Sequence, residues 1–89
     1  MLERHITLQN KLGLHARAAA KLVNTAAGFA SRVSLEFKGQ TADAKSIMSV
    51  MILAAASGSE ILIRCEGEDE AAAMDAICAL IDNLFGEDE

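Results

Sequence analysis

Apolar and polar residues alternate in three stretches of this 89-residue chain. A period of two is typical of strands that bury one face. The alternation is clean in residues 33–37 and 61–65, and less so in residues 2–8, where Arg4 interrupts it. The apolar members are Val33, Leu35, Phe37, Ile61, Ile63 and Cys65, and in the first stretch Leu2, Ile6 and Leu8. We therefore expect three half-buried strands.

A fourth, short strand is expected in residues 40–43. These residues have only a weak pattern of their own, but they directly follow the turn signal Lys38-Gly39. They therefore fit the return strand of a hairpin that begins with residues 33–37.

Two segments have the period of an amphipathic helix. Residues 16–27 place polar side chains on the face opposite the apolar one, namely Arg17, Lys21 and Asn24. Residues 69–85 begin with acidic side chains and stop at Gly86, both of which are typical of helix ends. The apolar stripes are Ala19, Leu22, Val23 and Ala26 in the first segment, and Met74, Ile77, Ile81 and Leu84 in the second.

The helix expected in residues 46–57 has two apolar stripes where one would cover a sheet. One stripe has Val50, Leu53 and Ala54, and the other has Ile47, Met48, Met51, Ile52 and Ala55. The second stripe is either core beneath a loop or an exposed patch that awaits a partner. Flexible methionine side chains suit a patch that meets several partners. The pattern alone leaves both interpretations open.

The elements follow in the order strand, helix, strand, strand, helix, strand, helix. This order predicts an α+β fold in which an antiparallel sheet is covered on one face by helices. Without a repeat or linker, the length fits a single domain over residues 1–89. Apolar residues make up 52% of the chain and charged residues 24%, which provides a core and excludes the disordered class.

Composition removes several classes of function. No apolar run reaches the roughly 18 residues of a membrane span, and the N-terminal residues have charges where a signal peptide is apolar, so we expect a cytoplasmic protein. Two cysteines, two histidines and no paired CxxC or HxxxH motif predict neither a disulfide framework nor a metal site, and no cofactor is expected. With three aromatic residues and a net charge of −5, nucleic acid is not the expected partner.

The charges are divided unevenly along the chain. Residues 1–64 hold all eight basic residues and four acidic ones, whereas residues 65–89 hold nine acidic and no basic residues. This division indicates a positive surface on the first part that faces an acidic partner or an anion. The C-terminal acids fit a solvated helix face and tail.

His15 lies directly before the first predicted helix, after the turn at Gly13. Ser, Thr, Asp and Asn are the preferred N-caps, so a histidine there gives up stability unless its ring has another task. The helix start offers the N–H groups of Ala16 and Arg17, the positive end of the dipole and the Arg17 guanidinium. The dipole also disfavours the imidazolium, which keeps a ring nitrogen lone pair available. This arrangement suits phosphoryl transfer to His15.

Structural interpretations stand beside these functional ones. A lone histidine with an arginine is more often an exposed loop residue, and we assign His5 to that class. Ser46 fits the N-cap of the middle helix, although no Glu or Gln completes a capping box. Lys21, Asn24 and Lys45 become candidates for partner contacts only through an expected position near His15.

Two segments, Lys11-Leu12-Gly13-Leu14-His15-Ala16-Arg17 and Lys45-Ser46-Ile47-Met48, also carry a family resemblance. The chain resembles the HPr family, the histidine-containing phosphocarrier proteins of the bacterial phosphotransferase system, over nearly its whole length. The resemblance implies an HPr-like open-faced β-sandwich, with a four-stranded antiparallel sheet covered on one face by three helices. It implies a phosphoryl carrier and not an enzyme.

The resemblance also implies roles for residues. His15 would accept a phosphoryl group on Nδ1 from enzyme I and pass it to a IIA-type protein, with Arg17 and the Ala16 amide as stabilising groups. Ser46 would be a regulatory site for a kinase. The docking surface would consist of Ile47, Met48, Met51 and Ile52 with Ala20, Lys21, Asn24, Lys45 and Ser49. A monomer is expected.

The chain departs from many family members in having Ala18 where they have proline. Alanine is a good early-helix residue, so the chemistry at His15 is expected to be unaffected. The amino-acid sequence of residues 10–20 and 45–51 resembles family members of the nitrogen branch of the phosphotransferase system more than those of the sugar branch. The same holds for the acidic end Phe85-Gly86-Glu87-Asp88-Glu89. The sugar branch stays as the alternative.

Two further function classes stay open. A small hydrolase that uses Arg17 as a phosphate cradle would survive the loss of His15. A regulator that only binds proteins would depend on Met48 and Met51, and His15 would be dispensable.

Overall fold

The computed structural model describes residues 1–86 of the chain, so Glu87, Asp88 and Glu89 of the predicted acidic tail lie outside the described residues. The elements occur in the predicted order. They are β1 (Leu2–Thr7), α1 (Ala16–Ala27), β2 (Arg32–Phe37), β3 (Gln40–Asp43), α2 (Ile47–Leu53), β4 (Glu60–Glu66) and α3 (Glu70–Asp82), followed by the short 3₁₀ turn η1 (Leu84–Gly86).

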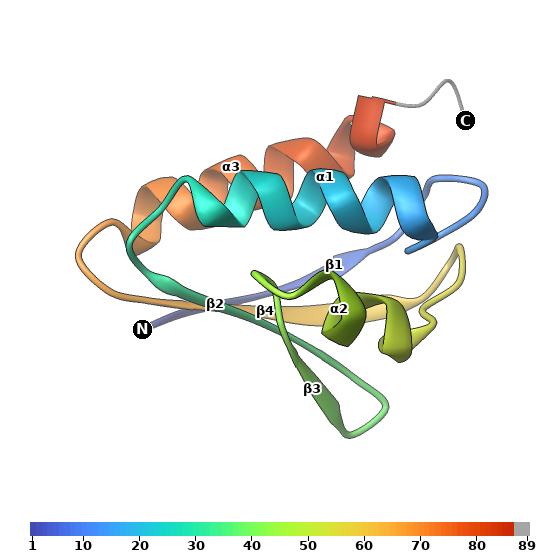
Figure 1. Ribbon diagram of the computed structural model, residues 1–89, viewed down its shortest axis with the longest axis horizontal. Coiled ribbons are helices and arrows are strands. Elements are labelled where there is room, and N and C mark those ends of the chain that lie inside the picture. Colours follow the sequence, from blue (N-terminus) through green and yellow to red (C-terminus); the bar gives the residue numbers. More distant parts are fainter. Residues whose placement is uncertain (87–89) are drawn as a thin grey trace.

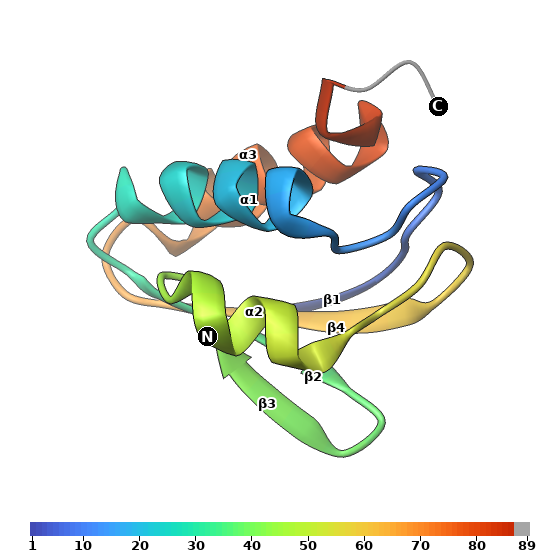
Figure 2. The ribbon, with the colours of Figure 1, turned by 45° about the vertical axis from the view of Figure 1, so that its right-hand side comes forward.

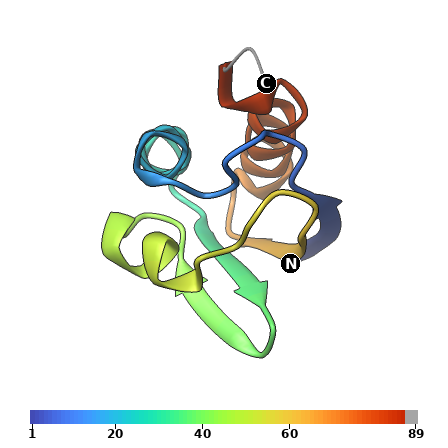
Figure 3. The ribbon, with the colours of Figure 1, turned by 90° about the vertical axis from the view of Figure 1, so that its right-hand side faces the viewer.

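Within residues 1–86, the four strands form one antiparallel sheet in the order β1-β4-β2-β3. All three helices lie on the same face of this sheet (Figure 1), which confirms the predicted α+β fold class. Figure 3 shows α1 and α3 nearly end-on and side by side, with α2 below α1 in this view, and α1 contacts both of the other helices. None of the helices in residues 1–86 is both long and apolar enough for a transmembrane segment.

The alternating pattern of β2 and β4 directs one row of side chains into the core. Cys65 pairs with Val33 and Ile63 pairs with Leu35, and all four are completely buried beneath the helices. The helices contribute Leu22, Val50, Met74, Ile77 and Ile81 to the same core. β2 and β4 therefore follow the sequence pattern closely, and β3 forms in residues 40–43, where the return strand of the hairpin was expected.

β1 differs from the expected half-buried strand. In the structure only Ile6 is partly covered, and Leu2 remains 39% exposed. The reason is that β1 is an edge strand that pairs only with β4, so that the helices extend over little of it. Leu8, the last apolar residue of the pattern, is completely buried but follows the strand as part of the next loop.

The outer face of the sheet is polar and has an ion-pair network at its centre. Arg64 of β4 donates to Glu3 of β1 at 2.5 Å and to Glu36 of β2 at 2.8 Å. These two hydrogen bonds, led by the one to Glu3, raise the pKa of the Arg64 guanidinium. The network links three strands across the face that no helix covers (Figure 1).

Two helices end earlier than the sequence predicts. α2 ends at Leu53 instead of continuing to residue 57, because Ala54 adopts the left-handed conformation that closes the helix. Because of this turn, the burial of Ala54 and Ala55 is the reverse of what the helical pattern predicts. Ala55 is buried, whereas Ala54, which was expected beside Val50 and Leu53, is exposed.

α3 ends at Asp82, and the chain then makes the turn η1. Leu84 and Phe85 both have a φ of +56°. This turn places Phe85 completely in the core and leaves Leu84 only partly covered, so Phe85 takes the buried position that the helical stripe assigned to Leu84.

Candidate functional site

His15 is the N-cap residue of α1, as predicted, with an extended backbone (φ −74°, ψ 177°). Its carbonyl accepts the hydrogen bond of Ala19 N at 2.8 Å, but its side chain does not cap the helix. The first N–H groups of α1, among them those of Ala16 and Arg17, therefore have no partner within the helix. They lie beside the imidazole at the positive end of the helix dipole.

Arg17 extends from the first turn of α1 and is exposed, whereas Ala18 next to it is completely buried. Ala18 packs into the core, and α1 begins at Ala16 without a proline at this position. An imidazole, the first amides of a helix and a guanidinium within three consecutive residues are groups that suit a phosphoryl dianion.

The loop that carries His15 is held against the segment that follows α2. Leu14 N donates to Ala55 O at 2.9 Å, and Leu8 exchanges hydrogen bonds with Gly58 and Ser59 at 2.7 and 2.9 Å. Gly13 makes this contact possible: its φ is +64°, and a Cβ there would lie 2.8 Å from the backbone of Ala56. Figure 2 shows the two loops next to each other at one end of the molecule.

Asn10 belongs to the same loop and was not singled out by the sequence analysis. Its side chain is completely buried and donates from Nδ2 to Gly13 O at 2.7 Å, while Gly13 N donates to Asn10 O at 3.2 Å. Asparagine three residues before a glycine is a turn signal, and this signal is what could have identified it.

Four of the five residues in the second apolar stripe of α2 are exposed, so these four are not core beneath a loop. Met48 and Ile52 are 66% and 68% exposed, and Ile47 and Met51 are each 39% exposed. We call these four residues the α2 patch. Leu12, in the His15 loop, adds another 66% exposed apolar side chain that the sequence analysis did not include.

The α2 patch adjoins the His15 loop. α1 and α2 pack against each other, and the C-terminal end of α2 meets the loop at the Leu14–Ala55 hydrogen bond. Of the residues expected around the patch, Asn24 is exposed, and Ala20, Lys21 and Ser49 are half-buried.

Lys21 is engaged within the chain. Its Nζ donates to Phe85 O at 2.6 Å, so it binds the carbonyl end of the turn that follows α3. Lys21 and Phe85 are 64 positions apart in the chain, so no local sequence pattern predicts this contact.

Lys45 and Ser46 lie at the opposite end of α1 from His15. Lys45 Nζ donates to Phe29 O at 2.7 Å, just beyond the C-terminus of α1, and α1 is about 18 Å long. The expectation that Lys45 lies near His15 is therefore wrong. Ser46 is the N-cap of α2, as predicted, and its hydroxyl accepts Ser49 N at 3.4 Å.

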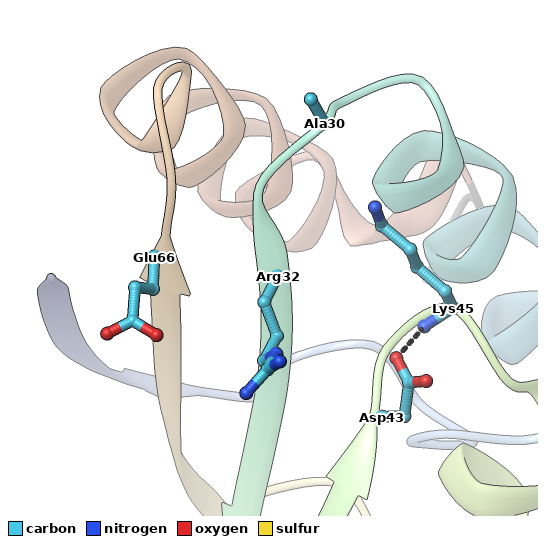
Figure 4. Close-up of a pocket in the computed structure, with 5 residues that line it drawn as sticks. All are labelled: Ala30, Arg32, Asp43, Lys45 and Glu66. Atoms are coloured by element: carbon cyan, nitrogen blue, oxygen red, sulfur yellow. Dashed lines mark hydrogen bonds between the residues drawn. The ribbon is translucent and has the colours of Figure 1, made fainter.

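A shallow depression lies at this far end of the molecule, lined by Ala30, Arg32, Asp43, Lys45 and Glu66. Figure 4 shows the Lys45 ammonium turned away from Asp43, whose carboxylate accepts the Lys45 backbone N–H at 2.9 Å. Two cationic and two anionic side chains line the depression, so its charge selects neither an anion nor a cation.

The two cysteines, Cys65 and Cys78, are both free and buried. Burial raises the pKa of the Cys65 thiol, which keeps it protonated and unreactive at neutral pH. Within residues 1–86, no three His, Cys, Asp or Glu side chains are grouped so as to hold a metal ion.

Comparisons with known proteins agree on one family. The family model described as the PTS HPr component phosphorylation site matches residues 2–83. The phosphocarrier protein HPr of Cupriavidus necator is 55% identical over 89 residues, which cover 100% of both chains. The phosphocarrier protein NPr of Shewanella violacea is 43% identical over 86 residues, covering 97% of this chain and 94% of the relative.

A solved structure has the same fold over the whole length. The crystal structure of HPr-C-His from Thermoanaerobacter tengcongensis superimposes with a TM-score of 0.96 at 42% sequence identity, and the match covers 100% of each chain.

Proposed function

Because the chain belongs to the HPr family of phosphocarrier proteins of the phosphotransferase system, we propose that His15 is the residue on which it carries the phosphoryl group. Members of this family are phosphocarriers and not enzymes, and their partners are proteins of that system such as enzyme I and IIA-type proteins. The observation that supports His15 is its position at the start of α1, beside uncapped amides and Arg17.

The transfer itself needs few groups. The lone pair of Nδ1 forms a bond to phosphorus while the bond from phosphorus to its donor group on enzyme I breaks. The amides of Ala16 and Arg17 donate to the phosphoryl oxygens, and the Arg17 guanidinium balances their charge. The bond between Nδ1 and phosphorus then breaks while phosphorus forms a bond to a histidine of the IIA-type protein, which returns His15 to its unphosphorylated form.

Intact mass after incubation with phosphoenolpyruvate and enzyme I tests this proposal. We expect the gain of one acid-labile phosphoryl group, absent in His15→Ala. His5→Ala is the matched control, because His5 is exposed on β1, where its Nδ1 lies 3.3 Å from a carboxylate oxygen of Glu60. Phosphorylation of His15→Ala, or an acid-stable product, would contradict the assignment of His15.

The α2 patch with Leu12 is the proposed docking surface for both partners. It is apolar, it is exposed, and it adjoins the His15 loop, so a partner seated on it reaches the ring. A carrier must release each partner quickly, which fits a small interface of less than about 1,200 Å² in total.

The nitrogen-regulatory branch is the branch that we propose. The amino-acid sequence of residues 10–20 and 45–51 supports this assignment. One of the similar proteins is named NPr, and several others are named HPr. Parallel phosphorylation by a nitrogen-branch and a sugar-branch enzyme I decides between them. Faster transfer from the nitrogen-branch donor is the expected result, and faster transfer from the other assigns the chain to the sugar branch.

Ser46 is proposed as a regulatory site for a kinase. A phosphate there would lie at the N-terminus of α2 next to Ile47 and would add negative charge at the edge of a surface that meets acidic partners. We expect Ser46→Asp to slow phosphoryl transfer from enzyme I relative to wild type. Ser46→Ala is the control that removes the N-cap without adding charge, and equal rates for Ser46→Asp and wild type would count against the proposal.

A regulator that only binds proteins is the second candidate, because the exposed α2 patch would suit it equally. A third candidate, an Arg17-based hydrolase, would turn over a phosphate ester without any partner. Met48→Asp separates the first two: in a carrier, His15→Ala and Met48→Asp both abolish function, whereas in a binding regulator only Met48→Asp does. We propose a cytoplasmic monomer, and light scattering of the purified protein tests the oligomeric state.

A further inference from the structure

The peptide unit between Gly13 and Leu14 is bound at both of its polar ends. Its carbonyl, from Gly13, accepts the Asn10 side-chain amide at 2.7 Å. Its N–H, from Leu14, donates to Ala55 O at 2.9 Å, just beyond α2. Two hydrogen bonds therefore fix the orientation of this peptide plane. One comes from Asn10 in the same loop, and the other goes to Ala55 in the segment that follows α2.

The burial of Asn10 is unusual for its surroundings. Asn10 is completely buried, whereas Lys11 and Leu12, which follow it in the same loop, are exposed. Burying a polar amide costs free energy unless it forms hydrogen bonds, and an apolar side chain would fill the same space without that cost. The hydrogen bond to Gly13 is thus the property that distinguishes asparagine from an apolar residue at this position.

The bound peptide plane determines how His15 enters the helix. On its C-terminal side, His15 is held by the hydrogen bond from Ala19 N to its carbonyl. On its N-terminal side, it follows directly on Leu14, which is 4% exposed and attached to Ala55. These two attachments restrain the backbone on both sides of His15, and with it the direction of the Cα–Cβ bond from which the ring extends.

We infer that Asn10 is a positioning residue for phosphoryl transfer at His15, acting through the Gly13–Leu14 peptide. The inference rests on the proposed function of His15. Without the Asn10 donor, the Gly13 carbonyl loses its partner and the peptide plane gains freedom to turn, which loosens the Leu14–Ala55 hydrogen bond. A reacting group displaced by about 1 Å can lose on the order of 10²-fold in rate.

Asn10→Leu tests the inference, because leucine has a similar size and shape but no donor. Its phosphorylation by enzyme I and phosphoenolpyruvate is measured against the concentration of the carrier. We expect kcat to fall by about tenfold or more while KM stays within about twofold, since the α2 patch is unchanged. Hydrogen exchange of the Leu14 amide should accelerate at the same time.

Ile81→Val is the matched control for a general loss of stability, because Ile81 is buried in α3 and has no part in the loop. It should keep the wild-type kcat and the wild-type exchange of the Leu14 amide. If Asn10→Leu does not fold, Asn10→Ala takes its place in the same assay.

A wild-type kcat in Asn10→Leu despite faster Leu14 exchange would overturn the inference, as would an equal loss of kcat in Ile81→Val. Both of these results leave His15 as the acceptor. Wild-type protein that takes up no phosphoryl group, or His15→Ala that does, would instead overturn the proposed function and this inference with it.

Discussion

Gly13 combines a left-handed backbone with a close approach to the end of α2. Gly39 shares the positive φ, at +80°, but a Cβ there would meet no atom within 4 Å. Substitution of Gly39 therefore tests only the free-energy cost of a positive φ in a residue with a side chain. Substitution of Gly13 adds the cost of steric overlap between the new Cβ and the backbone after α2. The two glycines also show why a glycine in the sequence announces a turn but not the contact that the turn makes.

Gly39→Ala should lower the free energy of unfolding by roughly 1–2 kcal/mol, the cost of a left-handed alanine. Gly13→Ala should lower it further, because the backbone of Ala55 and Ala56 must also move. Phosphorylation by enzyme I should slow only in Gly13→Ala. Denaturant unfolding with the phosphorylation assay measures both, and equal effects of the two substitutions would contradict the described packing.

Among single residues, the sequence predicted those whose chemistry is local. The position of His15 at the start of α1 was predicted because a glycine turn and an alanine-rich helix flank it, and that of Ser46 because it precedes a helix. Asn10 and Leu12 were missed, since one is defined by burial in a loop and the other by exposure, and neither property has a period along the chain.

At the level of elements, the last helix shows how the chain ends its own fold. α3 stops at Asp82, and the turn η1 then buries Phe85 with the help of two residues at positive φ. Lys21 of α1 binds the carbonyl of Phe85 and so attaches this turn to the helix that begins at His15. The spacing of apolar residues predicted a helix as far as residue 85, because this spacing shows which residues are apolar but not where the backbone leaves the helix.

Lys21→Met keeps the apolar part of the side chain but removes the donor, and it should lower the free energy of unfolding by about 1 kcal/mol. Lys21 is half-buried, so part of the effect is screened by solvent. Asn24→Met, at an exposed position on the same helix, is the control and should change stability by less. Thermal unfolding compares them, and equal melting temperatures for Lys21→Met and wild type would contradict a stabilising role of the contact.

Among the strands, burial was least predictable at the edge of the sheet. The pattern of β1 is the weakest of the three alternating strands because an edge strand needs little apolar surface, and the structure buries little of it. β2 and β4 lie in the middle of the sheet, and their alternation was correspondingly clear.

For the whole molecule, the end opposite His15 is held together by Asp69, the N-cap residue of α3. Its carboxylate accepts the hydroxyl and the N–H of Ser31 and the N–H of Ala30, in the loop before β2. These hydrogen bonds, led by that of the Ser31 hydroxyl, lower the pKa of Asp69. Gly67 N–H similarly lowers the pKa of Glu70.

A carboxylate whose pKa is lower in the folded than in the unfolded chain stabilises the fold at neutral pH. This contribution is complete above the unfolded value of about 3.9 and is lost as the pH falls through the folded value. In Asp69→Asn, the free energy of unfolding should therefore fall less steeply with decreasing pH below about pH 4 than in the wild type. Urea unfolding over this range measures the slope, with exposed Asp75→Asn as the control. An unchanged slope in Asp69→Asn would contradict the assigned hydrogen bonds.

The uneven distribution of charge predicts how partners find the molecule. Lys11 and Arg17 are exposed at the His15 end and favour encounter with an acidic partner. Raising the ionic strength from about 0.01 to about 1 M shortens the screening length from roughly 30 to 3 Å. We expect the KM for enzyme I to rise and kcat to change little, and a KM independent of salt would show that docking depends on the apolar α2 patch alone.

The pairing of β1 with β4 has a consequence for how the protein is made. The first strand of the chain finds its only partner in residues 60–66, and the His15 loop finds its supports in residues 55–59. During translation, the proposed phospho-acceptor His15 is thus synthesised early, whereas the residues that hold its loop are synthesised only after most of the chain. A prematurely terminated product would contain His15 and Arg17 without the supports that position them. We therefore expect incomplete chains to be poor phosphoryl acceptors.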